Sequence, residues 1–134
     1  MDASKWGSPL WFFLHTISFN YPDKPTYRDK SQYYDFFYNL QNILPCQSCK
    51  INYIKHLQRH PISPALDSKK SLVQWVIKIH NIVNIEGGKP AMSPQEVIQK
   101  YKAVYENKLG NGYCHYFDND PEKEKRKQEQ AIFW

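Results

Sequence analysis

The chain has 134 residues, with 18 Lys and Arg against 13 Asp and Glu, a formal net charge of +5, and 16% aromatic residues. This length fits one compact domain, and no apolar run approaches the ~18 to 20 residues that a membrane span needs. The basic residues are scattered and never alternate with aromatic residues in a run, so the composition argues against a nucleic-acid groove. The start of the chain does not have the pattern of a secretory signal, and we therefore expect a cytoplasmic protein.

Apolar residues recur three and four positions apart along most of the chain, a spacing that predicts helices, and no segment has the period of two that marks a strand. In the first helix, Ser8 is the expected cap and Pro9 the expected first helical residue. The expected helices cover about residues 9–20, 33–43, 45–59, 68–84 and 94–109. We therefore predict an all-α fold in residues 1–110, a four-helix bundle with a short fifth helix, followed by a flexible charged tail with an apolar end at 111–134.

Two cysteines at the expected start of the third helix form the sharpest motif in the chain, Pro45-Cys46-Gln47-Ser48-Cys49. Thiols with this spacing lie one turn apart, close enough to form a disulfide, and a helix N-terminus favours the thiolate at the first of them. The pattern indicates redox exchange, although two cysteines that simply fill space, or a zinc site with His56 and His60, are alternatives. A continuous helix would place Cys49 and His56 about 10 Å apart along its axis, too far for one zinc ion, so we expect no metal ligand here.

Two groups of side chains are candidates for one site that binds a large planar ligand. Trp11 and His15 lie one turn apart on the first expected helix, and His80, Val83 and Asn84 share one side of the fourth. Taken singly, each ring fits a core position better than a ligand site, but together they favour a stacking surface. The lysines available for phosphates of such a ligand are Lys89 and Lys100.

The ordered set of these motifs resembles the FAD-linked sulfhydryl oxidases of the Erv/ALR family over about residues 4–106. The pattern is Gly7-x-x-x-Trp11-x-x-x-His15, then Tyr21-Pro22, then Pro45-Cys46-x-x-Cys49, then Trp75-x-x-x-x-His80-Asn81-x-Val83-Asn84-x-x-x-x-Lys89. The resemblance implies that FAD is held in the bundle beside the disulfide, with Cys49 as the flavin-proximal thiolate and Cys46 as the thiol that exchanges with substrate. The residues that it places at the cofactor are Gly7, Trp11, His15, Tyr53, His80, Asn81, Val83, Asn84, Lys89, Lys100 and Tyr101.

The activity that the resemblance implies is the formation of disulfide bonds in protein substrates, which pass their electrons through the two cysteines and FAD to molecular oxygen and give hydrogen peroxide. The implied partners are protein thiols, directly or through a thioredoxin-like carrier, and a second copy of the chain that pairs through the first two helices. A non-enzymatic helical adaptor with a structural or interchain metal-binding Cys-x-x-Cys motif is the alternative from another class of protein.

The chain differs from the cellular members of the family in its cysteines. Cys46, Cys49 and Cys114 are its three cysteines, whereas the cellular proteins carry a further structural disulfide and, in most cases, a second redox pair. The chain is therefore more similar to the minimal oxidases of large cytoplasmic DNA viruses. This similarity implies a location in the host cytoplasm or the virion.

Overall fold

The computed structural model describes residues 1–106, which form two compact units. The unit of residues 1–92 contains α1 (Ala3–Phe19), α2 (Tyr27–Ile43), α3 (Gln47–Arg59), the short 3-10 helix η1 (Ser63–Asp67) and α4 (Lys69–Glu86). The unit that begins at Ser93 contains α5 (Pro94–Glu106). No strand occurs within the described residues, so the predicted all-α fold is confirmed. The predicted end of the fifth helix, the boundary at residue 110 and the tail at 111–134 lie outside the described residues.

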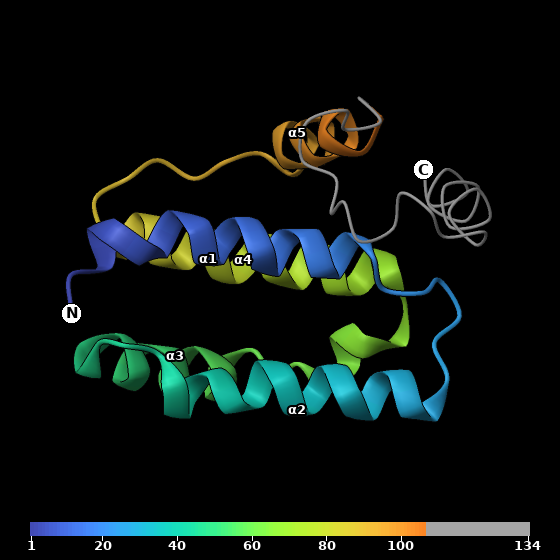
Figure 1. Cartoon of the computed structure of the whole chain (residues 1–134), viewed down its shortest axis with the longest axis horizontal. Helices are drawn as coiled ribbons and strands as arrows, with labels where there is room; N and C mark the ends of the chain where they lie inside the picture. Colours follow the sequence, from blue (N-terminus) through green and yellow to red (C-terminus); the bar gives the residue numbers. More distant parts are fainter. Residues whose placement is uncertain (107–134) are drawn as a thin grey trace, which may run out of the picture. The chain divides into compact units, whose positions relative to one another are not determined.

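The four long helices of the first unit form two layers (Figure 1). α1 packs against α4 in one layer, and α2 packs against α3 in the other. The short helix η1 contacts both α2 and α4, so it connects the two layers at one end. Among the described residues, no helix combines the length and the apolar character that crossing a membrane requires.

The cap at the start of α1 differs from the predicted one. The Asp2 carboxylate accepts a hydrogen bond from the Ser4 backbone amide at 2.9 Å, and the helix therefore begins at Ala3. The prediction that Ser8 caps this helix and that Pro9 opens it is wrong, because Pro9 lies inside the helix. An internal proline removes one backbone donor and typically costs about 3 kcal/mol. The first turns of α1 therefore form in spite of this cost.

The start of α2 also differs from the prediction, because the helix begins at Tyr27, about six residues before the expected start, with Thr26 as its cap. Several other helix ends agree with the predictions. At the start of α5, the Ser93 amide donates to the Glu96 carboxylate at 3.0 Å and the Glu96 amide donates to the Ser93 hydroxyl at 3.1 Å, which is the predicted capping box. α4 ends at Gly87, and Gly88 follows with φ 75°, in the left-handed region that favours glycine. The helix η1 was not predicted, because five residues are too few to show an apolar period.

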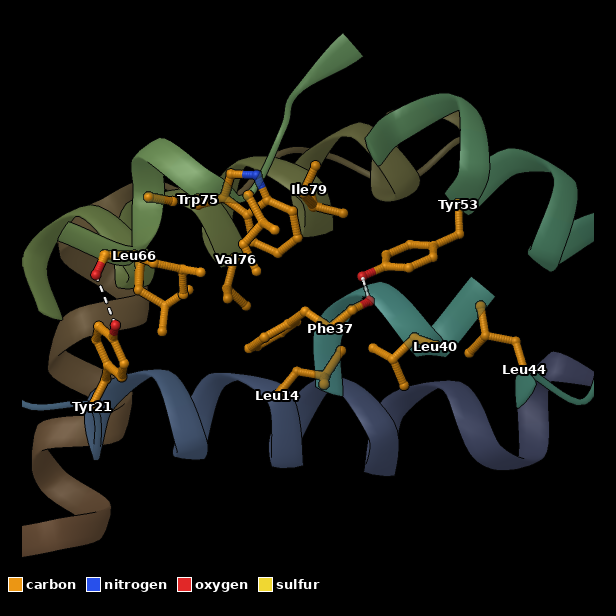
Figure 2. Packing of buried hydrophobic residues seen from close by; sticks show 13 residues of the cluster. Leu14, Tyr21, Phe37, Leu40, Leu44, Tyr53, Leu66, Trp75, Val76 and Ile79 are labelled. Atoms are coloured by element: carbon orange, nitrogen blue, oxygen red, sulfur yellow. Dashed lines mark hydrogen bonds between the residues drawn. The ribbon is translucent and has the colours of Figure 1, made fainter. Parts of the chain in front are cut away.

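Apolar side chains from both layers meet in one core (Figure 2). The rings of Phe37 and Trp75 pack edge to face, with their centroids 5.5 Å apart. Two buried hydroxyl groups bond across elements: Tyr53 donates to the Phe37 carbonyl at 2.6 Å, and Tyr21 donates to the Leu66 carbonyl at 2.7 Å. The first bond holds α3 against α2, and the second holds η1 against the end of α1. Each satisfies a buried polar group whose burial would otherwise be costly.

Candidate functional site

A disulfide joins Cys46 and Cys49 at the N-terminus of α3, with their Cα atoms 5.1 Å apart. Cys46 is the N-cap residue, and its sulfur accepts a hydrogen bond from the Cys49 amide at 3.3 Å. The hydroxyl of Ser48 lies 3.2 Å from the same sulfur and donates to it, because a disulfide sulfur has no proton. Hydrogen bonds and a helix N-terminus both stabilise negative charge, so this environment favours a thiolate at Cys46 when the bond is reduced.

A cavity of about 170 Å³ lies beside the disulfide, within the first unit. Its lining comes from α1, α2, α3 and α4, and most of the side chains are apolar or aromatic. Cys49 belongs to this lining, whereas Cys46 does not. The described lining residues are Ala3, Trp6, Gly7, Leu10, Trp11, Leu14, Leu40, Leu44, Cys49, Asn52, Tyr53, His56, Val83 and Glu86. The two sulfurs of one redox bond therefore have different surroundings.

Three predicted rings from α1 and α4 come together as one cluster. Trp11 and His80 stack with their centroids 4.1 Å apart and their planes 6° from parallel. Nε2 of His15 lies 2.8 Å from Nδ1 of His80, so one imidazole donates and the other accepts. His15 is buried, at 1% exposure. Trp11 and His15 of α1 thus meet His80 of α4, although 65 positions separate His15 from His80.

Some of the other predicted cofactor residues line the cavity and some do not. Gly7, Tyr53 and Val83 line it together with Trp11. Burial raises the pKa of the Tyr53 hydroxyl, which therefore stays protonated as a donor. The side chain of Asn81 instead bonds to the backbone of Met92, donating to its carbonyl at 2.8 Å and accepting from its amide at 2.9 Å. This residue fixes the chain that follows α4.

The remaining predicted residues lie outside the cavity lining. Asn84 is partly buried on α4, and its carbonyl accepts from the Lys89 amide at 2.7 Å. The Lys89 side chain is exposed. Lys100 and Tyr101 belong to α5 in the second unit, where the Lys100 ammonium lies 5.9 Å from the centre of the Tyr101 ring. His15 and His80 are also outside the lining, and the stack of His80 on Trp11 connects them to it. The α5 pair belongs to the second unit.

Four polar or aromatic residues of the lining were not predicted: Trp6, Asn52, His56 and Glu86. The indole nitrogen of Trp6 is buried and has no hydrogen-bond partner among the described residues. Asn52 and His56 follow Cys49 by three and seven positions, so the helical period could have placed them on the same face of α3. Trp6 was missed because the first helix was expected to begin after it. No spacing or motif in the sequence marks Glu86 as a residue of the site.

A redox disulfide that opens onto an aromatic cavity, inside a helical bundle, defines a thiol–disulfide oxidoreductase with room for a planar group. A family model described as the Erv1 / Alr family matches residues 8–102. The chain belongs to this family.

Similar proteins come from viruses and from cells. A protein of Acanthamoeba polyphaga mimivirus is 37% identical over 118 residues, which is 87% of this chain and 82% of that protein. It is named "probable FAD-linked sulfhydryl oxidase". The mitochondrial FAD-linked sulfhydryl oxidase of Schizosaccharomyces pombe is 34% identical over 70% of this chain and 52% of its own length. The FAD-linked sulfhydryl oxidase of an African swine fever virus isolate is 27% identical over 78% of this chain and 82% of its own length.

A solved structure has the same fold. The crystal structure of the FAD binding domain of Erv1 from Saccharomyces cerevisiae matches with a TM-score of 0.71 and 27% sequence identity. The match covers 76% of this chain and 95% of that domain. The helical arrangement of the first unit is therefore one that an FAD-binding domain of the family also has.

Proposed function

We propose that this chain is an FAD-linked sulfhydryl oxidase that forms disulfide bonds in protein substrates and passes their electrons to molecular oxygen. One observation carries the proposal: the Cys46–Cys49 disulfide has one of its two sulfurs in the lining of an aromatic cavity. The family of the chain and the names of its relatives support the same activity. FAD, when bound, supplies a two-electron acceptor for thiols that oxygen can reoxidise.

The residues of the cavity fit a flavin. Trp11, Tyr53 and Val83 offer flat or apolar surface, and Gly7 leaves open space, since a Cβ added there would meet no atom within 4 Å. The buried indole N–H of Trp6 is a donor that a polar ring atom of a ligand would satisfy. We propose that these residues, with His15, His80, Asn81, Asn84, Lys89, Lys100 and Tyr101, hold the cofactor.

The thiol exchange follows from the different surroundings of the two cysteines. A substrate thiolate attacks the Cys46 sulfur, the Cys46–Cys49 bond breaks, and Cys49 receives the electron pair as a thiolate in the cavity lining. A second substrate thiolate then attacks the mixed disulfide, which releases the substrate disulfide and leaves Cys46 as a thiolate that its hydrogen bonds stabilise. Each substrate thiol loses its proton when it becomes a thiolate, so two electrons and no proton leave the two cysteine thiolates when the Cys46–Cys49 bond forms again.

We also propose the partners and location that the family resemblance implies. Protein thiols, directly or through a thioredoxin-like carrier, and oxygen are the substrates, and nucleic acid is not a partner. A second copy pairs through α1 and α2, where Phe13 and Phe36 meet edge to face at 6.1 Å although both side chains remain exposed. The mimivirus and African swine fever virus relatives match this chain over 82% of their own length. On this ground we propose that the protein is located in the host cytoplasm or the virion.

The experiment that tests the function begins with the colour of the purified protein. We expect a yellow protein with an FAD absorbance spectrum, which consumes oxygen and forms hydrogen peroxide when dithiothreitol is added. The double variant Cys46→Ser with Cys49→Ser is the control, and it should bind FAD without turnover. A colourless protein that neither binds added FAD nor consumes oxygen would contradict the proposal and favour the adaptor.

A further inference from the structure

His56 and Glu86 form a polar pair in the cavity lining that the thiol exchange does not use. Nε2 of His56 donates to Oε2 of Glu86 at 3.1 Å, which joins α3 to α4. The His56 side chain is 4% exposed, whereas that of Glu86 is 47% exposed. The pair therefore connects the inside of the cavity with the solvent through a single hydrogen bond.

The proposed reaction moves protons as well as electrons through this cavity. Two thiols and one oxygen molecule give one disulfide and one hydrogen peroxide, so the two protons that leave sulfur are the two that oxygen finally carries. The substrate thiols release their protons outside the cavity, and an apolar cavity stabilises a free proton poorly, so a titratable group has to carry protons between the solvent and the cavity.

The titratable groups of the described lining are Cys49, Tyr53, His56 and Glu86. Cys49 is the reacting group itself. Tyr53 is occupied as a donor to the Phe37 carbonyl at 2.6 Å, and its burial favours the protonated hydroxyl. Histidine is the side chain that ordinarily changes its charge between about pH 5 and 8. Among these lining groups, His56 is the one that can accept a proton at one ring nitrogen while it donates another from the second, and its Nε2 already faces Glu86.

We propose that His56 and Glu86 carry protons between the cavity and the solvent, an inference that depends on the proposed oxidase function. A proton from the cavity binds Nδ1 of His56, and the proton on Nε2 passes to Oε2 of Glu86 and from there to water. The return of a proton uses the same atoms in the reverse order. His56 lies seven residues after Cys49, about 10 Å along the helix, so the proposed route requires water between the sulfur and the imidazole.

The charges around His56 are consistent with this route. Glu86 is the acid that faces it from α4. His60 lies close by, and burial together with the positive charges of Lys78, His56 and Arg59 lowers the pKa of His60, so His60 is neutral near pH 7. The described lining residues from α1 and α2 are Ala3, Trp6, Gly7, Leu10, Trp11, Leu14, Leu40 and Leu44, none of which carries a charge.

The test follows one reduction of the FAD-loaded protein by dithiothreitol without oxygen, between about pH 5 and 8. Flavin absorbance reports the electrons, and a pH-indicator dye reports the protons. In Glu86→Gln the amide can still accept the hydrogen bond from His56 but cannot take the proton. We expect both signals to slow at least about 10-fold in His56→Gln and in Glu86→Gln, a smaller loss than the 10²–10⁴ of a base in direct contact. The matched control is His60→Gln, which should behave as the wild type because the His60 side chain is not in the lining.

Thermal unfolding and FAD content separate proton transfer from a structural role. If the pair only ties α3 to α4, His56→Gln lowers the unfolding temperature, but its proton signal keeps the rate and pH dependence of the wild type. In that case Glu86→Gln also stays close to the wild type. An unchanged proton signal in His56→Gln, or in Glu86→Gln, overturns the inference. Restoration of the proton signal in His56→Ala by added imidazole would support it. A wild type without FAD or oxidase activity would contradict the proposed function as well, whereas an active wild type with unaffected variants would contradict this inference alone.

Discussion

The surroundings of the two redox cysteines differ at the scale of single atoms. The Cys46 sulfur accepts hydrogen bonds from the Cys49 amide and the Ser48 hydroxyl, and Cys49 lies in the lining of the cavity. The local sequence pattern places both thiols at a helix start but does not distinguish which one meets a ligand, and only the family resemblance assigned that part to Cys49. Which of the two thiols lines the cavity depends on how α3 is rotated about its axis, and the packing of α3 against α2 and α4 sets this rotation.

The first prediction separates the two thiols by substitution. Cys46→Ser leaves Cys49 as a free thiol in the cavity lining, so we expect bound FAD, no turnover, and a long-wavelength absorbance band from a thiolate that donates to the flavin. Cys49→Ser should be equally inactive and should lack the band, because Cys46 is outside the lining. Visible absorbance spectra of the two purified variants measure this difference. A band in Cys49→Ser and none in Cys46→Ser would reverse the proposed roles.

The helices themselves were largely predictable, because apolar spacing and capping residues are local signals. The capping box at Ser93 and the glycine stop after α4 are confirmed, but the start of α1 was misplaced by the rule that a proline opens a helix. The Asp2 cap and the packing of Trp6 and Leu10 against the core outweigh the cost of Pro9 inside the helix. This balance involves tertiary contacts, which no local pattern contains.

The second prediction concerns the first turn of α1, which carries the cavity residues Trp6 and Gly7. Asp2→Ala removes the cap, and we expect it to lower the free energy of unfolding by about 1 kcal/mol and to weaken FAD binding as this turn frays. Thermal unfolding measures the first effect, and titration of FAD-free protein with FAD measures the second.

The matched control for this variant is Thr26→Ala, because Thr26 caps α2 with a hydrogen bond from the Asp29 amide at 3.1 Å. It should cost a similar amount of stability and leave FAD binding unchanged, since the cavity-lining residues of α2, Leu40 and Leu44, lie at the far end of that helix. Equal loss of FAD affinity in both variants would mean that the start of α1 has no special part in the site.

At the scale of the whole molecule, the site depends on pairings between helices that are distant in the chain. The Trp11–His80 stack needs α1 beside α4, and the His56–Glu86 bond needs α3 close to α4. The resemblance to the Erv/ALR family predicted Trp11 and His80 as members of one site, because both belong to its motifs. His56 and Glu86 are outside the pattern that carries the resemblance, and their meeting follows only from the folded arrangement of two layers.

The last prediction concerns self-association through the outer surface of α1 and α2. Phe13 is 49% exposed and Phe36 is 37% exposed, and the contact between their rings joins the two helices into one apolar surface. Large apolar side chains that remain in water lose the stabilisation that burial in an interface would provide, on the order of 1.5–3 kcal/mol for each fully buried side chain.

We expect light scattering to give twice the 16.0 kDa mass of one chain, and the double variant Phe13→Glu with Phe36→Glu to give the mass of a monomer that retains its FAD. Ile85 is exposed on a different helix, α4, and Ile85→Glu is the matched control that should leave the dimer intact. A wild type that is monomeric at every concentration tested would contradict the proposed pairing, and a double variant that remains dimeric would exclude this surface as the interface.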